Sequence, residues 1–297
     1  MTLSSDLVCF GEILWDILPS GKVLGGAPFN IVNRAHALGL KSYVISSVGE
    51  DELGSEILKL VEARGLATSF IQRHSNLPTG VVNIDVGEGG EPEYDILYPV
   101  AWDDIHFVET LKSCVEQSRA FVYSSLGLRD QRARDSLFQL LDYASLKICD
   151  INLRKGHYEE ATIQKMVEKA DILKANEHEL AMVAEWNQLN HLELKEQIAA
   201  LSQMYSFQCV LVTLGSKGAI AYKESEWFQQ PVFPVTISDT VGAGDAFLAS
   251  FIHQYLYGND LQQCLKFACA VGALTASKAG GTPSIKRSEI EVLMQTS

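Results

Sequence analysis

Short apolar runs alternate with longer amphipathic stretches along most of the chain, and this alternation limits the fold more than any other feature. The strand-like runs are Leu7–Phe10, Tyr43–Val48, Ala120–Ser124, Lys147–Ile151, Ile172–Lys174 and Cys209–Thr213. Strands that alternate with helices favour a parallel sheet with helices on both faces. We therefore predict an α/β protein, a three-layer α/β/α fold with a mostly parallel central sheet.

The amphipathic stretches have helical spacing and carry helix start and stop residues. The helical patterns are Pro28–Leu38, Asp51–Arg64, Gln131–Ala144, Tyr158–Ala170 and two helices within 242–278, on either side of a turn at 258–260. Pro28 suits a first helical turn, and Gly39 and Gly65 suit the position after a last turn.

One region departs from this alternation. Thr79–Val86 and Glu93–Val100 have strand-like alternation and flank the turn sequence EGGEP, which is typical of a β-hairpin. A hairpin in an α/β chain is either a structural flap or a lid over a site, and the pattern favours neither. Ligand sites in such folds lie at the carboxyl ends of the strands, where a lid would be well placed.

Composition indicates one globular domain and excludes some partners. The chain has 297 residues, of which 47% are hydrophobic and 21% charged, and no linker-like segment divides it. A formal net charge of −13 without a Lys/Arg-rich run argues against nucleic-acid binding, and no apolar run reaches membrane-spanning length. Six cysteines without a C-x-x-C pair predict buried free thiols. With no signal peptide apparent, we predict a cytoplasmic protein.

The segment Asp239–Asp245, DTVGAGD, is the strongest chemical signal. It opens an apolar helix with small residues, which leave backbone N–H groups open to an anion at the positive end of the helix dipole. Asp245 would repel a bound phosphate unless it faces an attacking hydroxyl, so it suits a general base. The alternative is a capped helix start with tight glycine packing. Six specified residues occur by chance in on the order of one in 10⁴–10⁵ chains, which favours function.

Two early segments carry further polar candidates. Gly25–Asn30, GGAPFN, places two glycines before a helix, and a tight turn with an N-cap explains it equally well. Asp16 lies on an early segment, where it is either a solvated turn residue or an acceptor for two hydroxyls.

DTVGAGDAF and GGAPFN together resemble the C-terminal and N-terminal signatures of the PfkB, or ribokinase-like, sugar kinases. The resemblance implies one ribokinase-like domain over residues 1–297, with a small β-sheet lid from about 13–24 and 74–102. It implies that Asp245 is the base and that the transferred phosphoryl group meets N–H groups of Gly242, Ala243 and Gly244. Substrate contacts are implied for Asp16, Gly25, Gly26 and Asn30. A Walker A sequence is absent.

Asp150, Asn152 and Arg154 stand at alternate positions, so an extended strand end would point all three the same way. A surface-facing strand end is the plain alternative. The triplet resembles the D-x-N-x-R of fructokinase-like and ketodeoxygluconate-kinase-like members, which implies substrate contacts. Arg154 would then neutralise the transferring phosphate or touch the substrate.

Two later motifs resemble nucleotide and metal positions of the family. Asn176 and Glu179 match its N-x-x-E, which places Asn176 near ATP and Glu179 near Mg²⁺ through water, although a helix capping pair explains them too. The loop after the strand ending at Thr213 resembles the nucleotide loop, and a simple hairpin turn is its alternative. Its implied nucleotide-binding residues are Thr213, Gly215, Lys217 and Gly218.

The small residues near the C-terminus form a candidate site for a monovalent cation, potassium in the first place. Its candidate residues are Asp239, Thr275, Gly280 and Ser284, and a helix C-terminal glycine stop accounts for part of this pattern. In the predicted lid, Tyr94, Tyr98 and Trp102 are core residues by default, and one or two of them are candidates to cap a sugar ring.

The sequence therefore predicts transfer of a phosphoryl group from ATP, with Mg²⁺, to a primary hydroxyl of a sugar. Asp16 together with GGAPFN resembles fructokinase-like members of the family more than ribokinase, which favours fructose as the acceptor, and 2-keto-3-deoxygluconate, ribose and a nucleoside are alternatives. A non-catalytic sugar or nucleotide sensor on the same fold is a rival of another class, but a sensor needs no base at position 245. The expected partners are the sugar and ATP, and a homodimer is left open.

Overall fold

The computed structural model describes residues 4–19, 21–86 and 92–295. Its central sheet has nine strands in the order β13-β12-β11-β10-β9-β8-β1-β4-β5. The strands are β1 Ser5–Phe10, β4 Ser42–Gly49, β5 Ile71–His74, β8 Ser118–Ser124, β9 Lys147–Asp150, β10 Ile172–Asn176, β11 Cys209–Thr213, β12 Ala219–Lys223 and β13 Glu226–Gln230. From β5 to β11 all neighbours pair in parallel, whereas β12 and β13 extend the sheet antiparallel.

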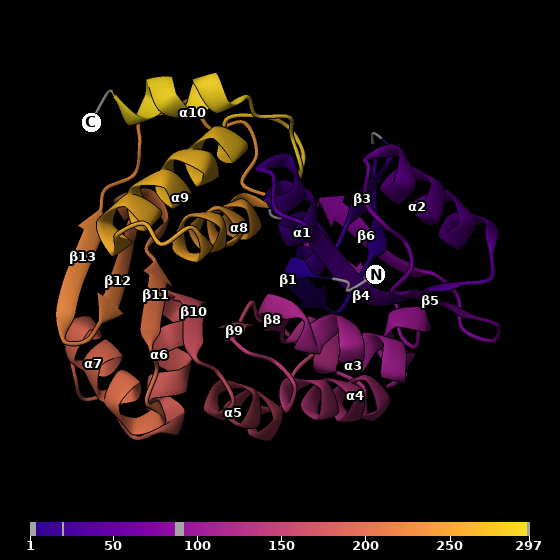
Figure 1. The fold of residues 1–297 in the computed structure, drawn as a ribbon, viewed down its shortest axis with the longest axis horizontal. Helices are drawn as coiled ribbons and strands as arrows, with labels where there is room; N and C mark the ends of the chain where they lie inside the picture. Colours follow the sequence, from indigo (N-terminus) through magenta and orange to yellow (C-terminus); the bar gives the residue numbers. More distant parts are fainter. Residues whose placement is uncertain (1–3, 20, 87–91, 296–297) are drawn as a thin grey trace.

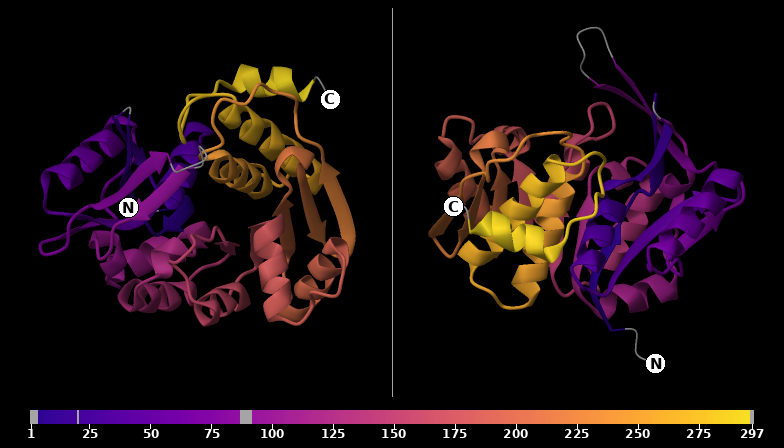
Figure 2. Two further views of the ribbon diagram at one scale, coloured as in Figure 1. Left: turned by 180° about the vertical axis from the view of Figure 1, so that it is seen from behind. Right: turned by 90° about the horizontal axis from the view of Figure 1, so that it is seen from above.

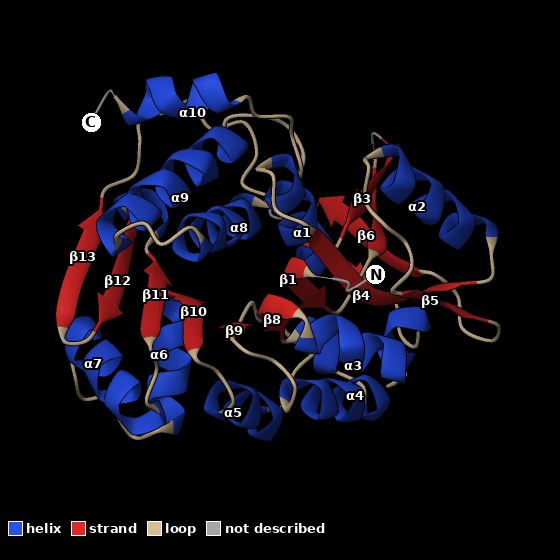
Figure 3. Ribbon diagram, viewed as in Figure 1, coloured by secondary structure: helices blue, strands red, loops and turns tan. Residues whose placement is uncertain are grey.

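Helices cover both faces of this sheet, which confirms the predicted three layers (Figures 1 and 3). One face carries α1 Ala27–Ala37, α2 Glu52–Ala63, α8 Ala243–Leu256, α9 Leu261–Ala276 and α10 Arg287–Met294. The other carries α3 Glu109–Glu116, α4 Gln131–Leu141, α5 Glu160–Glu168, α6 Glu177–Trp186 and α7 Leu194–Tyr205. Each face has its own hydrophobic core, because alternate residues of the buried strands point to opposite faces.

Side-chain caps explain where several helices begin. Asp51, Asp130 and Asp260 each accept a backbone N–H of the first turn of α2, α4 and α9. Helix α8 is apolar around most of its circumference, and it lies buried between α1 and α9. Its N-terminus is thereby held in a fixed place at the edge of the sheet.

A second sheet of four strands, in the order β3-β2-β6-β7, stands beside the first. Its strands are β2 Leu14–Leu18, β3 Gly21–Gly25, β6 Gly80–Val86 and β7 Pro92–Ile96. The predicted hairpin is confirmed as the antiparallel pair β6–β7, although β7 ends four residues earlier than expected and most of the EGGEP turn lies outside the described residues. Figure 2 shows the β6–β7 ribbon extending beyond the rest of the molecule.

The small sheet packs one of its faces against α2. The indole of Trp15, on β2, donates to the backbone oxygen of Leu53, and Lys22 of β3 pairs with Glu56. The opposite face of the sheet is left to line a cavity. Parallel pairing of β2 with β6, between residues 66 positions apart in the sequence, joins the early segment to the hairpin.

All six cysteines are buried and free, as the apolar sequence around them predicted. Among the described residues, none of the helices is both long and apolar enough to cross a bilayer.

Candidate active site

A cavity of about 510 Å³ lies between the carboxyl ends of the central strands and the small sheet. The body of the protein contributes polar groups that follow β1 and β9, lie within β10, or belong to the first turns of α1 and α8. Strands β2, β6 and β7 contribute the facing wall. The lining includes Glu12, Asn30, Asn152, Arg154, Lys174, Gly242, Gly244 and Asp245 from the body, and Leu14, Asp16, Val82, Ile84, Tyr94 and Ile96 from the small sheet. This is where α/β folds of this type bind ligands.

The start of α8 forms the floor of the cavity. Gly242 is the N-cap, with φ 72°, and a Cβ atom there would stand 2.2 Å from the backbone oxygen of Gly281. Only glycine fits both this left-handed backbone and this close approach. Gly242 and Gly244 are partly exposed and line the cavity at the positive end of an apolar helix. Ala243 does not line it, and its N–H already donates to the Thr240 backbone oxygen at 3.2 Å, unlike the free N–H that was predicted. An anion site at this helix start stays a prediction.

Asp245 lies in the first turn of α8, and its Oδ2 accepts a hydrogen bond of 2.9 Å from the Asn30 side chain. The two signature motifs, 215 residues apart, therefore meet at this contact. Burial raises the pKa of Asp245, while the Asn30 hydrogen bond and the charges of Lys174 and Arg154 counteract the rise. A carboxylate with a raised pKa is a better proton acceptor than an ordinary one, which suits a general base.

Asp16 faces the same cavity from β2. A Cβ atom on Gly25 would stand 2.1 Å from Asp16 Oδ2, so the first glycine of GGAPFN makes room for this carboxylate. Burial raises the pKa of Asp16 to about 6, with Arg154 lowering it and Asp245 raising it further. Asp16 is therefore mostly ionised at pH 7 and can accept hydrogen bonds from two hydroxyls.

Two charged residues in the cavity were missed by the sequence reasoning. Glu12 is 2% exposed, and its Oε1 accepts the Ala27 N–H at the start of α1, while burial raises its pKa to about 7. Lys174 is 6% exposed and binds Asp150 Oδ1 at 2.8 Å. The signal that would have found Lys174 is a lysine inside an otherwise apolar strand, where a charge needs a buried partner.

The prediction that Asp150, Asn152 and Arg154 point the same way is wrong. Strand β9 ends at Asp150, and Asn152 has φ 41°, so the alternation of an extended strand stops before the second residue of the triplet. Asp150 is fully buried beneath the cavity, against Lys174, and does not line it. Asn152 and Arg154 do line it, and the guanidinium donates to Asn152 Oδ1.

Asn176 and Glu179 form the capping pair at the start of α6. Asn176 Oδ1 accepts the Glu179 N–H, and Glu179 Oε2 accepts the Asn176 N–H at 2.9 Å. The other oxygen of Glu179 accepts the Leu153 N–H, so this buried carboxylate also holds the loop that carries Arg154. Neither residue is among those that line the cavity.

The predicted nucleotide loop lies at the same edge of the sheet but outside the cavity. Thr213 is the register partner of Asn176 on the neighbouring strand, which brings the two predicted nucleotide positions together. Residues 215–217 make a single helical turn between the antiparallel strands β11 and β12, so the hairpin alternative is correct as a description of the backbone. Lys217 is exposed and pairs with Glu177 at 3.6 Å, and Gly218 is buried.

The predicted monovalent-cation residues are only partly assembled. Asp239 accepts the N–H groups of Val241 and Gly280, which ties the anion-site loop to the 279–284 segment. Thr275 is fully buried and donates its hydroxyl to Val271, inside α9. The backbone oxygen of Ser284 accepts from the Lys278 ammonium at 2.8 Å.

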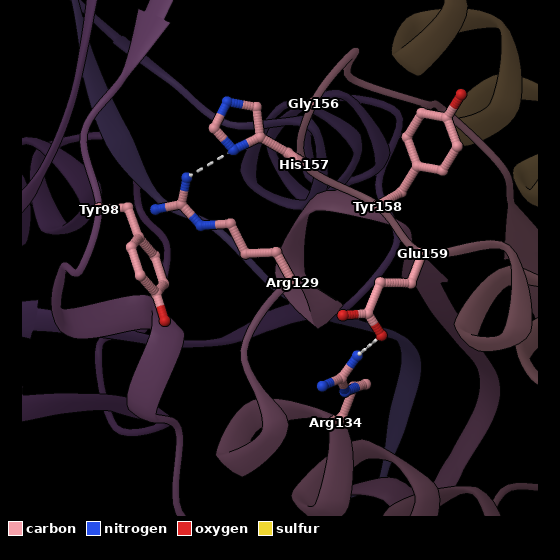
Figure 4. A pocket seen from close by; sticks show the side chains of 7 residues that line it. All are labelled: Tyr98, Arg129, Arg134, Gly156, His157, Tyr158 and Glu159. Atoms are coloured by element: carbon pink, nitrogen blue, oxygen red, sulfur yellow. Dashed lines mark hydrogen bonds and ion pairs between the residues drawn. The ribbon is translucent and has the colours of Figure 1, made fainter.

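The three lid aromatics have separate environments. Tyr94 is half exposed and lines the cavity, whereas Trp102 is fully buried in the core. Tyr98 borders another hollow of about 290 Å³, on the outer side of the 154–159 loop (Figure 4). There Arg129 binds Asp103 and His157, so its charge is already paired, and Asp245 is not part of this lining.

Comparisons with known proteins extend over nearly the whole chain. The model of the family described as pfkB family carbohydrate kinase matches residues 20–287. Fructokinase-1 of Oryza sativa subsp. japonica is 26% identical over 317 residues, covering 97% of this chain and 96% of the relative.

Two solved structures match the fold. An uncharacterized sugar kinase of Pyrococcus horikoshii in complex with ATP has a TM-score of 0.79 and 28% identity, with 97% of this chain and 99% of that chain covered. A fructokinase of Xylella fastidiosa with bound ATP has a TM-score of 0.84 and 24% identity, with 100% and 99% covered, and at that identity it supports the fold alone.

Proposed function

The chain belongs to the pfkB family of carbohydrate kinases, and on that premise we propose that it phosphorylates a neutral sugar, with fructose as the favoured acceptor. The observation that carries the proposal is the contact between Asn30 and Asp245 in a cavity that Asp16 faces from the other side. This arrangement supports the proposal, because side chains that can bind hydroxyls stand on both sides of a carboxylate that can accept a proton. A sensor that only binds would need no such acceptor.

The reaction is an in-line phosphoryl transfer. The sugar oxygen forms a bond to the γ-phosphorus of ATP, the bond to the β–γ bridging oxygen breaks with its electron pair going to ADP, and Asp245 takes the hydroxyl proton. The N–H groups of Gly242 and Gly244, at the positive end of the α8 dipole, stabilise the negative charge of the moving group. Asn30 keeps the base oriented toward the hydroxyl.

The residues fit a Mg²⁺ ion that is held through water and substrate phosphates. Both oxygens of Glu179 already accept backbone N–H groups, from Leu153 and Asn176, so each has one remaining lone pair for a water ligand. Mg²⁺ usually keeps several waters and binds few carboxylates directly. When bound, the ion would neutralise phosphate charge, and Glu179 would orient its waters while holding the Arg154 loop.

A potassium site at the 279–284 segment stays a proposal, supported by the link between Asp239 and Gly280. The Lys278 ammonium on the Ser284 oxygen supplies a positive charge to part of this segment already. We therefore expect initial rates to be modestly but measurably higher in potassium salts than in sodium salts. Equal initial rates in the two salts would contradict the proposed potassium site.

The charges of the cavity support a neutral acceptor over a sugar acid. Asp16, Glu12 and Asp245 face a cavity in which Arg154 lowers the pKa of all three. Arg154 is exposed and its guanidinium donates to Asn152 and Leu153, so within the described residues its charge acts on these carboxylates without a direct ion pair. The carboxylate of 2-keto-3-deoxygluconate would meet the mostly ionised Asp16 in a cavity that also holds Glu12 and Asp245, and buried unpaired charge is costly.

The deciding measurement is kcat/KM for fructose, ribose, 2-keto-3-deoxygluconate and adenosine under one set of conditions. We expect fructose to exceed each of the others by about tenfold or more, a difference of roughly 1.4 kcal/mol in transition-state binding. A better rate with another sugar would end the fructose assignment and leave the kinase assignment standing. Phosphorylation of none of the four would count against both.

A further inference from the structure

Lys174 is a buried lysine whose ammonium pairs with a single carboxylate among the described residues. It projects from β10, an otherwise apolar strand, and is 6% exposed. Within the described part of the chain, Asp150 Oδ1 is the partner of its ammonium, at 2.8 Å, although an ammonium has three donors. Two donors therefore remain for a group that the protein itself does not supply.

The ammonium stands beside the anion site. Lys174 Nζ lies 3.5 Å from the position that a Cβ atom on Gly244 would take, and Lys174 lines the same cavity as Gly242, Gly244 and Asp245. Its electrostatic influence reaches Asp245, whose pKa it lowers against the effect of burial. A positive charge at this place faces the negative charge that develops during phosphoryl transfer.

Asp150 holds this lysine in place. It is fully buried at the end of β9, the strand next to β10, and its second oxygen has no hydrogen-bond partner among the residues that the structure describes. Burial lowers the pKa of Lys174, but the Asp150 and Glu179 carboxylates outweigh burial, so the ammonium remains charged. Burial raises the pKa of Asp150 to about 6, which leaves the pair ionised at pH 7.

We propose that Lys174 is a catalytic residue that binds the transferring phosphoryl group, and that Asp150 is the positioning residue that aims it. The inference rests on the proposed kinase function. Lys174 keeps its proton throughout: the sugar hydroxyl proton goes to Asp245, and the electron pair of the broken P–O bond leaves with ADP. The ammonium adds a fixed positive charge beside the N–H groups of Gly242 and Gly244.

The test compares Lys174→Met with Lys147→Met. Lys147 begins the strand that ends at Asp150, is partly exposed and makes only a loose pair with Asp171, so it loses the same charge away from the cavity. We expect Lys174→Met to lower kcat about 10²–10³-fold, with sugar KM within about threefold, and Lys147→Met to match the wild type. Asp150→Asn should lower kcat by a smaller factor, because the ammonium remains but is no longer aimed.

A binding measurement separates this role from a structural one. Fluoroaluminate with ADP and sugar mimics the moving phosphoryl group, and calorimetry compares its binding with that of ADP and sugar alone. In the wild type, we expect fluoroaluminate to increase the affinity for ADP. In Lys174→Met, this increase should be at least tenfold smaller, whereas the affinity for ADP without fluoroaluminate should match that of the wild type. A lysine needed only for folding would weaken both equally.

The outcomes are separable. If Lys174→Met unfolds, the double variant Lys174→Met/Asp150→Asn removes both buried charges together and serves in its place. A kcat within threefold of the wild type, with full fluoroaluminate tightening, overturns the proposal. If the wild type phosphorylates no sugar, the proposed function fails, and the fluoroaluminate titration alone decides about Lys174. If fluoroaluminate then increases ADP affinity in the wild type but not in the variant, the result supports the binding of the phosphoryl group by Lys174. If it does not increase ADP affinity in the wild type, the proposal is overturned.

Discussion

The two walls of the cavity are built in different ways. The body wall stands on the ends of buried parallel strands and the first turn of α8, where Asp245, Asn30 and Lys174 are each held by a partner from a distant segment. The small-sheet wall stands on β2, β6 and β7, where Asp16 and Tyr94 are partly exposed and carry no side-chain hydrogen bond in the described residues. A rigid wall suits bond-making groups, and an open wall suits an acceptor that enters and leaves.

The difference between the two walls predicts different effects of substitutions on kcat and KM. Substitutions on the body wall should lower kcat, because they remove interactions that are strongest in the transition state. Substitutions on the small-sheet wall should mainly raise the KM for the sugar.

The largest effect is expected at Asp245. Asp245→Asn keeps the size of the side chain but removes the proton acceptor, so turnover should fall about 10²–10⁴-fold while sugar and ATP bind roughly as before. Steady-state kinetics and calorimetry measure the two quantities. The matched control is Asp142→Asn, an exposed carboxylate after α4, which should leave both unchanged. Near-normal turnover of Asp245→Asn would show that Asp245 is not the general base, and it would also contradict the proposed kinetic difference between the two walls.

Asp16→Asn tests the other wall. Hydrogen bonds to a charged group contribute about 1.5–3 kcal/mol, so the KM for fructose should rise roughly 10–150-fold with a much smaller change in kcat. The control is Asp95→Asn on β7, where the carboxylate accepts from Asn83 and does not line the cavity. A kcat loss as large as that of Asp245→Asn would show that the two walls are not separate in function.

The sequence predicted the body wall better than the small-sheet wall, for a physical reason. Helix and strand periods are local, and the apolar runs of β1, β4 and β8 and the glycine-rich start of α8 are each readable within one segment. Strands β2 and β3 are five residues long and partly exposed, so their period is weak. The parallel pairing of β2 with β6 depends on contacts between residues 66 positions apart, which no local pattern predicts.

Two errors within the site have a common cause. Asp150 was expected to face the substrate, and Lys174 was passed over inside an apolar strand. Each residue is explained only by the other, because two buried charges on adjacent strands pair with each other. The direction of Asn152 could not be foreseen either, since its left-handed backbone follows from the loop that Glu179 holds.

A pH profile sharpens the assignment of Asp16. Burial raises the pKa of Asp16 to about 6. The charge of Arg154 lowers this pKa, the charge of Asp245 raises it, and Glu12 lines the same cavity. The ionised form accepts hydroxyls, so sugar affinity should be full above pH 7 and fall as the pH drops through about 6. At pH 5 about nine-tenths of Asp16 would be protonated, which corresponds to a loss of up to about tenfold. The measurement is fructose KM from pH 5 to 8, and Asp16→Asn should lack this step. If the fructose KM of Asp16→Asn changes with pH as much as that of the wild type, the titrating group is another carboxylate.

The smallest effect is expected at Tyr94. Its ring is half exposed and lines the cavity from β7, so Tyr94→Ala removes an aromatic contact without disturbing the core. Such contacts contribute about 0.5–1.5 kcal/mol, and the fructose KM should rise roughly 2–13-fold. Because a covered site also excludes water, ATP hydrolysis without sugar should rise relative to sugar phosphorylation.

The matched control for this lid contact is Tyr98→Ala, which removes the same ring from the other hollow, where its hydroxyl donates to Asp130. It should change neither fructose KM nor the ratio of hydrolysis to sugar phosphorylation. If both tyrosine variants behave like the wild type, the β6–β7 ribbon does not cover the sugar, and its part in this wall is confined to pairing with the strand that carries Asp16. If both variants raise hydrolysis equally, the ribbon acts as a whole through its position, and the Tyr94 ring has no contact of its own with the sugar.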